Sequence, residues 1–165
     1  MAKTKAAIDA GPLMHFCELE KHGLLGNIAE LHTTAEVFDE LLDKHKSLLK
    51  PSLKLHDLTE QQKNATKFLV ERFELQMGEA SAISLAKGEN IRLFLTDDLA
   101  ARIVAKRMDL EPHGTLGMLV RAFRIGLLSK SEIITLLHKI PSTTLFITTD
   151  LIQWAVKEVN QYSKR

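Results

Sequence analysis

The sequence predicts an α/β fold in which a parallel β-sheet is covered by helices on both faces. Short apolar runs, which are typical of buried strands, alternate along the chain with longer segments of helical periodicity. Hydrophobic residues make up 45% of the 165 residues, which is enough to build an ordinary core. No linker rich in Gly, Ser or Pro interrupts the chain, so we expect one domain over residues 1–165.

The first unit of the chain is predicted to be a strand, an acidic residue, a turn and a helix. Ala6–Ile8 is a short apolar run that ends at Asp9. Gly11 and Pro12 then mark a turn, and Pro suits the first position of a helix. A strand that ends in an acidic side chain is therefore expected at the start of the sheet.

The next segments are predicted to be helices separated by a loop. Thr33 and the acid three residues after it resemble a capping box at the start of the run Glu36–Leu42, which has helical periodicity. The stretch Lys44–Thr59 is basic and is interrupted by Pro51, so we expect a loop there. Glu60–Met77 has its large apolar residues on or near one side, which indicates a further helix.

The second half repeats the alternation of strand and helix and places acidic residues after a strand. Asp97 and Asp98 follow a compact apolar run that indicates a buried strand, and Gly88 is expected to close a helix at its C′ position. In chain order the expected elements are a helix over Glu79–Lys87, a strand over Ile91–Thr96, a helix over Leu99–Arg107, a short strand at Leu110–His113, a helix from Gly114–Thr115, a helix around Glu132–His138, and an apolar run Leu145–Ile147 before a helix from Asp150.

Charge, cysteine content and hydropathy disfavour several classes of protein. The net charge is +1, from 22 Lys and Arg against 21 Asp and Glu, whereas tight non-specific nucleic-acid binders are usually clearly basic. An enzyme that contacts its substrate only briefly is compatible with this charge. Cys17 is the single cysteine, so no internal disulfide forms, and we expect this side chain in the core. We find neither a signal peptide nor a run approaching the roughly 18 apolar residues of a membrane span, and expect a cytoplasmic protein.

Acidic side chains fall where an open parallel sheet binds its ligands, beyond the carboxyl ends of its strands. Asp9 ends the first predicted strand, and Asp97 and Asp98 end a later one. If those strands are neighbours their carboxylates converge, and Glu40 and Glu79 could reach the same edge from helices. Oxygen donors without nearby thiolates favour a hard cation, Mg²⁺ or Mn²⁺. Such an ion can lower the pKa of bound water and neutralise charge on a phosphate.

Each of these acidic residues also has a structural explanation that the sequence leaves open. Asp9 before a Gly-Pro turn is compatible with a turn or cap residue, and Asp98 before a helix is compatible with an N-cap. Glu40 is compatible with a solvated helix face, and Glu79 with a favourable charge at a helix start. Spacing along the chain does not decide between these structural roles and a metal site.

Candidates for contacts with RNA or protein lie in the second half of the chain. Arg102 and Lys106 are four residues apart on one predicted helix, which suits either RNA phosphates or a solvated face. The Gly114–Gly117 segment could present backbone N–H groups to a phosphate, or its glycines could serve close helix packing. Trp154 is expected in the core or in a dimer contact rather than stacked on a base.

Five segments follow one another along the chain: Ile8–Leu13, Val37–Leu41, Gly78–Ile83, Leu95–Arg102 and Gly114–Gly117. In this order they resemble the PIN-domain family, in a largely uncharacterised branch similar to the toxin nucleases of toxin–antitoxin pairs. The resemblance covers nearly the whole chain and implies a three-layer PIN-like fold, with a parallel sheet flanked by helices on both faces. It also implies a hydrolase, an endoribonuclease that cleaves RNA phosphodiester bonds with Mg²⁺ or Mn²⁺. The partners implied are RNA, a second copy in a homodimer, and a small antitoxin.

The resemblance assigns roles to the acidic residues one by one. The first-strand Asp of the family falls on Asp9, and its helical Glu falls on Glu40. Its third acid falls on Glu79 and its last on Asp98, with Asp97 as a close alternative. The implied catalytic residues are then Asp9, Glu40, Glu79 and Asp98. The implied metal ligands are Asp9, Glu79, Asp98 and Asp97.

The sequence also departs from the family pattern. Many relatives outside this branch have Asp where this chain has Glu79, although the longer side chain can still bind a metal. The family typically has Ser or Thr beside its first Asp, whereas Ala10 and Gly11 supply no hydroxyl. Together with the neutral charge, these departures leave open an alternative, a catalytically weak or inactive PIN-like module that binds nucleic acid or a protein. A phosphatase-like or receiver-like domain is disfavoured, because no partner Lys accompanies the acids as a receiver requires.

Overall fold

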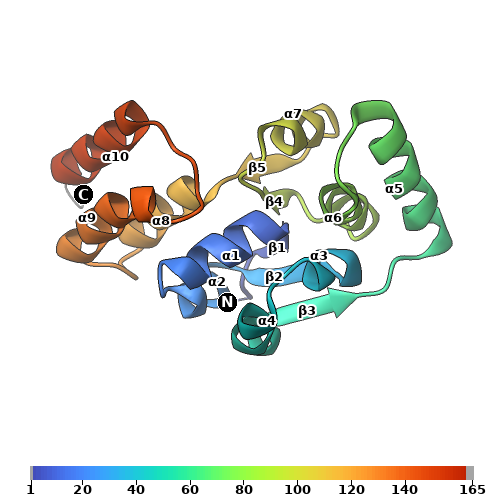
Figure 1. Ribbon diagram of the computed structural model, residues 1–165, viewed down its shortest axis with the longest axis horizontal. Coiled ribbons are helices and arrows are strands. Elements are labelled where there is room, and N and C mark those ends of the chain that lie inside the picture. Colours follow the sequence, from blue (N-terminus) through green and yellow to red (C-terminus); the bar gives the residue numbers. More distant parts are fainter. Residues whose placement is uncertain (1, 163–165) are drawn as a thin grey trace.

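The sheet is parallel throughout and has the first strand at its centre. The computed structural model describes residues 2–162, in which the strands are ordered β3-β2-β1-β4-β5 (Figure 1). Ala7 lies opposite His32 of β2 on one side and Phe94 of β4 on the other. The predicted α/β class is therefore confirmed. The strands are β1 (Lys5–Ile8), β2 (Glu30–Thr34), β3 (Leu53–His56), β4 (Leu93–Leu95) and β5 (Glu111–His113).

Helices connect the strands and continue the chain after the last one. Short 3-10 helices follow two of them, each with a proline in its first turn. The α-helices are α1 (Ala10–Glu18), α2 (His22–Ile28), α3 (Ala35–Asp39), α4 (Asp43–Leu49), α5 (Glu60–Phe73), α6 (Met77–Gly88), α7 (Leu99–Arg107), α8 (Thr115–Arg124), α9 (Lys130–Lys139) and α10 (Thr149–Gln161), and the 3-10 helices are η1 (Lys50–Ser52) and η2 (Ile140–Ser142).

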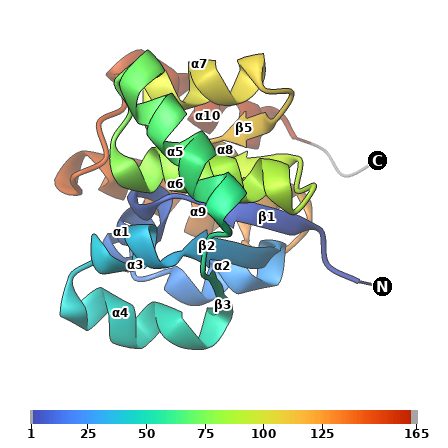
Figure 2. The ribbon, with the colours of Figure 1, turned by 90° about the vertical axis from the view of Figure 1, so that its right-hand side faces the viewer.

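The helices cover both faces of the sheet. On one face, α6 packs on β1, β2 and β4, while α5 packs on α6 and α7 on β5; α6 and α7 lie above β1 and β2 in Figure 2. On the other face, α2 packs on β2 and contacts α1 and α4, and α4 lies at the bottom of the same view. This is the three-layer arrangement that the resemblance implied.

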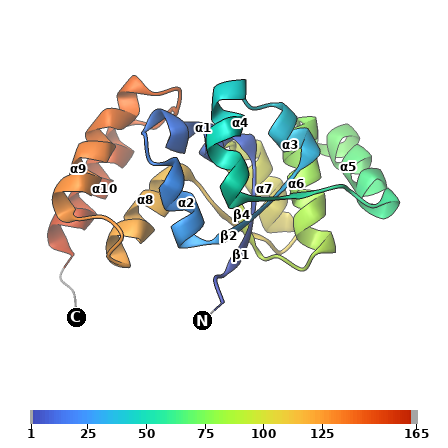
Figure 3. The same cartoon turned by 90° about the horizontal axis from the view of Figure 1, so that it is seen from below.

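The last helices, α8, α9 and α10, form a group at one end of the sheet. They pack on one another, and Figure 3 shows them beyond α1 and α2. α8 also contacts α1 and α2, so the group joins the rest of the molecule. One cluster of buried apolar side chains extends from Ala6 to Val159, which supports the proposal of a single domain.

The central strand explains why the first predicted element was easy to recognise. Ala6, Ala7 and Ile8 are fully buried, with no exposed surface. A parallel strand covered on both faces carries a continuous apolar run rather than an alternating one. The strands β2 and β4 lie beside β1, and helices cover both faces of the sheet. This position limits the access of water to Asp9, the residue that follows β1.

The predicted loop at Lys44–Thr59 is wrong, and β2 was not predicted at all. The loop region contains α4 and the edge strand β3, while β2 is polar in sequence but almost entirely buried. Its polar side chains are paired: the Thr33 hydroxyl donates to the Ile8 carbonyl at 2.8 Å, and the Thr34 hydroxyl bonds the Ser81 hydroxyl at 2.7 Å. Hydrogen bonds between segments far apart in sequence therefore replace the apolar signal of a strand.

Two predicted helices have different limits in the structure. The helix predicted over Glu36–Leu42 is the short α3, and its N-cap is Thr34 rather than Thr33, because the Thr34 hydroxyl accepts from Val37 N at 3.1 Å. The helix predicted over Glu60–Met77 ends at Phe73, where Glu74 takes a left-handed conformation with φ 56°. A new helix, α6, then begins at Met77.

Gly88 serves helix packing and not the C′ position that was predicted for it. It is the last residue of α6, and the left-handed conformation falls on Asn90, with φ 54°. A Cβ at Gly88 would lie 3.1 Å from Cδ of Gln62 and nearer still to its amide nitrogen. Gln62 is buried and its amide oxygen accepts from Thr59 N at 2.9 Å, closing the capping box of α5. The glycine therefore lets α5 and α6 approach each other.

We predict that Gly88→Ala lowers the free energy of unfolding by about 1–3 kcal/mol, as overpacking of a filled site does. The matched control is Gly117→Ala in α8, where an added Cβ meets nothing within 4 Å. This control should gain up to about 1 kcal/mol from helix propensity. Urea unfolding monitored by circular dichroism checks both variants. A Gly88→Ala variant as stable as Gly117→Ala would contradict the packing role.

Candidate functional site

The ends of β1 and β4 lie side by side at the point where the chain changes direction across the sheet. From β1 the chain proceeds to β2 and β3 on one side and then returns to β4 and β5 on the other. Ile8 pairs with Leu95, and the backbone N–H of Asp9 donates to the Leu95 carbonyl at 2.9 Å. Open parallel sheets bind ligands beyond the carboxyl ends of their strands at such a switch point.

Thr96 links the acidic residues that follow these two strands. The Asp9 carboxylate accepts from Ala10 N at 2.7 Å and from the Thr96 hydroxyl at 3.0 Å. The same hydroxyl accepts from Asp98 N at 3.2 Å, and Asp98 caps α7 by accepting from Ala101 N at 2.7 Å. Thr96 is fully buried. One hydroxyl therefore fixes the backbone of Asp98 relative to the carboxylate of Asp9.

Glu40 and Glu79 come from helices on either side of this edge. Glu40, the C-cap of α3, accepts from Gly78 N at 3.1 Å. A Cβ at Gly78 would lie 2.7 Å from the Glu40 carboxyl carbon, so only glycine gives Glu40 this place. Glu79 sits in the first turn of α6 and accepts from Gln76 N at 2.9 Å. Both glutamates are thus held near the start of α6.

The four acids, Asp9, Glu40, Glu79 and Asp98, are close enough to affect one another electrostatically. Burial raises the pKa of Asp9 to about 6, and the charges of Glu40 and Asp98 add to this effect. Burial also raises the pKa of Glu79 to about 7, with contributions from Asp98 and Asp9. The pKa of Glu40 is raised by burial and by Glu79. Neighbouring carboxylates that resist ionisation indicate a place where a cation would be stabilising. We call these four residues the acidic cluster.

The donor atoms of the acidic cluster are of the kind that binds a hard cation, but its carboxylates are too widely spaced to surround one. All its donors are carboxylate oxygens, the type that Mg²⁺ and Mn²⁺ prefer. Within residues 2–162, however, no group of three His, Cys, Asp or Glu side chains is arranged so that it could hold a metal ion. Each carboxylate instead uses one oxygen to bind a backbone N–H. The carboxylates lie at one edge of the sheet but are not arranged as the ligands of a single metal ion.

The carboxylate of Asp97 is bound by hydrogen-bond donors that lie outside the acidic cluster. It accepts from His15 Nδ1 at 2.7 Å, from Thr115 N at 2.7 Å and from the Thr115 hydroxyl at 2.6 Å. Burial raises the pKa of Asp97, but the bonds from His15 and Thr115 outweigh burial and leave it below its usual value. Three donors bind the carboxylate of Asp97, whereas the carboxylate of Asp98 accepts from Ala101 N, so Asp98 is the better candidate of the two for a metal ligand.

The two basic residues predicted to contact RNA differ in their freedom. Arg102 is partly buried, and its Nε donates to the Thr96 carbonyl at 3.2 Å. Its guanidinium lies against Gly114, where a Cβ would also come within 2.8 Å of the Asp97 carboxylate. Close packing therefore accounts for Gly114. Lys106 is exposed and stays a candidate for a phosphate contact.

Sequence reasoning missed His15, Thr96 and Gly78 as parts of this edge. Thr96 could have been found, because it directly precedes the acidic pair at a strand end. His15 gave no signal, since its partner lies 82 residues away in sequence. Gly78 lies in a segment that carries the family resemblance, but its bond to Glu40, 38 residues away, could not be predicted. Cys17 is buried as expected, and burial raises its pKa to about 11.

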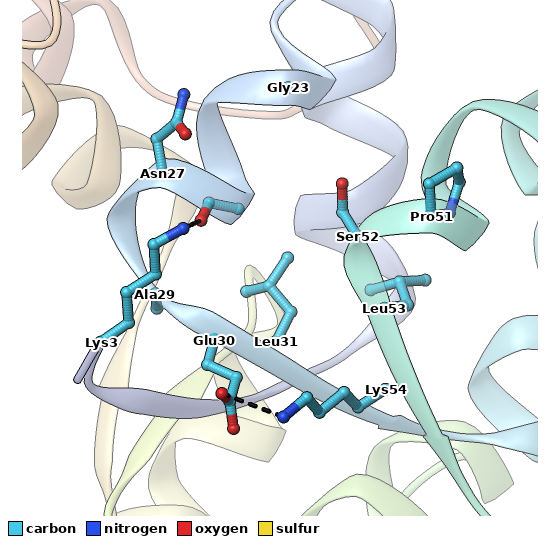
Figure 4. A pocket seen from close by; sticks show the side chains of 11 residues that line it. Lys3, Gly23, Asn27, Ala29, Glu30, Leu31, Pro51, Ser52, Leu53 and Lys54 are labelled. Atoms are coloured by element: carbon cyan, nitrogen blue, oxygen red, sulfur yellow. Dashed lines mark hydrogen bonds and ion pairs between the residues drawn. The ribbon is translucent and has the colours of Figure 1, made fainter.

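Two hollows elsewhere on the molecule lack this chemistry. One, of about 390 Å³, lies at the opposite end of β2 and β3 (Figure 4). There Lys3 Nζ donates to the Gly26 carbonyl at 2.6 Å and Lys54 pairs with Glu30 at 3.0 Å, so both ammonium groups are already engaged. The other, an apolar groove of about 500 Å³, lies between β4, α8 and the half-exposed Trp154.

We predict that Asp9→Asn stabilises the metal-free protein near neutral pH. Because the pKa of Asp9 is higher in the folded state than its ordinary 3.8, the folded protein holds this proton more tightly. Stability contributed by the protonated form is therefore lost as pH rises through the window from about 4 to about 6. Removing the charge should raise the free energy of unfolding by about 1–3 kcal/mol at about pH 8.

The measurement is urea unfolding in EDTA at several pH values. The advantage of Asp9→Asn should shrink towards pH 4 and disappear at about pH 3, below the ordinary pKa of 3.8, where the wild-type carboxyl is protonated in both states. Asp150→Asn, an exposed acid on α10, is the control and should show no such dependence. An advantage that is equal at both pH values, or a loss of stability at high pH, would contradict the conclusion that burial disfavours the charged form of Asp9.

Comparison with known proteins assigns the family. A family model described as a PIN domain matches residues 5–161, and no curated protein and no solved structure matches the chain. Within residues 2–162, no helix is long and apolar enough to cross a membrane. PIN domains are generally nucleases, which are hydrolases, and they typically use divalent metals. With the three-layer fold and a match over nearly its whole length, the chain belongs to the PIN-domain family.

Proposed function

We propose that this protein is a metal-dependent endoribonuclease that cleaves RNA phosphodiester bonds at the ends of β1 and β4. The observation that carries the proposal is the acidic cluster, in which the pKa of Asp9 rises to about 6 and that of Glu79 to about 7. Buried like charges destabilise a protein unless a counter-ion offsets them. Membership of a family that is generally nucleolytic supports a catalytic use for such an arrangement.

In this proposal Asp9, Glu79 and Asp98 hold Mg²⁺ or Mn²⁺. When bound, such an ion lowers the pKa of water and neutralises charge on the phosphate. The Asp9 carboxylate is oriented by Thr96 and Ala10, and the Asp98 carboxylate by its capping bond to α7. Both carboxylates are therefore fixed in place before a metal ion binds. Glu40 as a residue is exposed, whereas its carboxyl group lies partly buried against Gly78, which raises its pKa. Access to water and a raised pKa suit it to accept a proton from the attacking water.

Lys106 would add a phosphate contact beside this site. It is exposed on α7, the helix that Asp98 caps, whereas the guanidinium of Arg102 is engaged with the Thr96 carbonyl. With a net charge of +1, few phosphates would be neutralised at once. We therefore propose that the protein binds RNA briefly, as an enzyme binds its substrate, and does not hold it in a tight complex.

A protein partner is a further part of the proposal. Large apolar side chains on the α8–α10 group are exposed, among them Ile125, Leu151 and Trp154, and two of these, Ile125 and Trp154, line the apolar groove. Exposed apolar surface of this kind is common where proteins associate. A second copy in a homodimer or a small antitoxin is proposed here, and the toxin role itself rests on the resemblance of the sequence motifs.

One observation favours a second candidate function. The open spacing of the acidic cluster, with no group of three potential ligands arranged for a metal ion in residues 2–162, suits an inactive PIN-like module that binds RNA or protein. Such a module would retain the fold and lose the cation. Metal binding therefore separates the two candidates.

We predict metal-dependent cleavage of RNA by the wild-type protein. Labelled single-stranded and structured RNAs are incubated with Mg²⁺, Mn²⁺ or EDTA, and products are resolved on denaturing gels. Asp9→Asn and Asp98→Asn should each reduce the rate by roughly 100-fold or more, because even groups outside the ligand shell are worth about 10–100-fold. Glu40→Gln should reduce the rate without abolishing metal binding.

Asp150→Asn is the matched control, since it removes an exposed carboxylate on α10 away from the acidic cluster. It should cleave as the wild type does. Cleavage that survives EDTA or the loss of Asp9 would contradict the proposal. Absence of cleavage together with absence of metal binding by calorimetry would favour the inactive module.

A further inference from the structure

A buried cluster of His15, Asp97 and Thr115 lies beside the acidic cluster and belongs to no part of the proposed chemistry. We call it the Asp97 cluster. Asp97 receives its bonds from His15 Nδ1 at 2.7 Å and from the Thr115 N–H and hydroxyl at 2.7 and 2.6 Å. His15 and Thr115 are both buried, at 8% and 0% exposure. Satisfied donors around a carboxylate this shielded make its position rigid.

The Asp97 cluster joins two segments that adjoin a residue of the acidic cluster to the start of α8. His15 is on α1, whose N-cap is Asp9. Asp97 directly precedes Asp98, the N-cap of α7. Thr115 begins α8, whose own N-cap, Gly114, has no side chain to offer, so Asp97 supplies the missing acceptor. Figure 1 shows α1 between β4 and α8, and α1 contacts α8 directly.

Asp9 and Asp98 are therefore tied to each other along two routes. The short route is the Thr96 hydroxyl, which donates to Asp9 and accepts from Asp98 N. The second route runs from Asp9 through one and a half turns of α1 to His15, and from His15 through Asp97 to Asp98. Thr96, the first residue of the β4–α7 turn, is also held through its backbone, by His113 and Arg102. The bond from His15 holds the next residue, Asp97, to α1, the helix that Asp9 caps.

We propose that His15 is a positioning residue that, through Asp97, holds Asp98 at the place where it can share a cation with Asp9. This inference rests on the function proposed above, because the cation is the one proposed there. The hydrogen bond of His15 goes to Asp97, outside the acidic cluster, and in this proposal His15 takes no part in the chemistry. Its contribution is the hydrogen bond from Nδ1, which a side chain with a donor at the same place can replace.

The test compares Mn²⁺ affinity, measured by calorimetry, in the wild type, His15→Leu and His15→Asn. The Asn amide nitrogen can reach the place of Nδ1, whereas Leu fills the space without a donor. We expect His15→Leu to weaken Mn²⁺ binding about tenfold or more, as losses outside the ligand shell do, and His15→Asn to restore most of it. Thr115→Val and Thr115→Ser form a second pair of the same logic if His15→Leu does not fold.

His32→Leu is the control for a general loss of stability. His32 is equally buried, and its ring nitrogens bond His56 and Glu30 at 2.8 Å each, all on β2 and β3. This variant should lower the melting temperature and leave Mn²⁺ affinity unchanged. Equal affinity in His15→Leu and the wild type, or an equal loss in His32→Leu, would overturn the positioning role alone. A wild type that binds no Mn²⁺ would overturn the proposed function and this inference together.

Discussion

The burial of carboxylates at the ends of β1 and β4, with a smaller contribution from their mutual repulsion, is the constraint on which the arrangement of this molecule depends. Asp9 follows a strand that is buried on both faces, so water reaches its charge poorly and its pKa rises to about 6. The other acids are brought to the same edge by parallel pairing and by α3 and α6. Each element nearby contributes something that makes these charges tolerable.

Helix starts provide much of that compensation. Asp9 caps α1, Asp98 caps α7, and Glu79 lies in the first turn of α6. The amino end of a helix carries partial positive charge and free N–H groups, which stabilise a carboxylate. The same three positions that looked like ordinary caps in the sequence are thus compatible with a functional role. Capping holds one oxygen of each carboxylate, and the remaining charge of the acidic cluster is what a cation would neutralise.

The parts of the fold that could be predicted from the sequence are those with a local signal. The strand before Asp9 is apolar because it is buried on both faces, and the acids at strand ends follow from parallel topology. β2 could not be predicted, since Thr33 and Thr34 are satisfied by partners that are distant in sequence. The glycines at 78, 88 and 114 make room for Glu40, Gln62 and Arg102. No local sequence pattern indicates such contacts, and the hydrogen bond between His15 and Asp97 could not be predicted for the same reason.

The central claim is that the acidic cluster holds protons that a divalent cation displaces. Titrating Mn²⁺ into the protein by calorimetry at about pH 6.5, in two buffers of different ionisation enthalpy, counts the protons released. Because the pKa of Glu79 is about 7 and that of Asp9 about 6, binding should release protons at this pH and release almost none at about pH 9. Asp9→Asn should weaken the binding and reduce the release. Binding without proton release at the lower pH, or binding that Asp9→Asn leaves unchanged, would contradict this account.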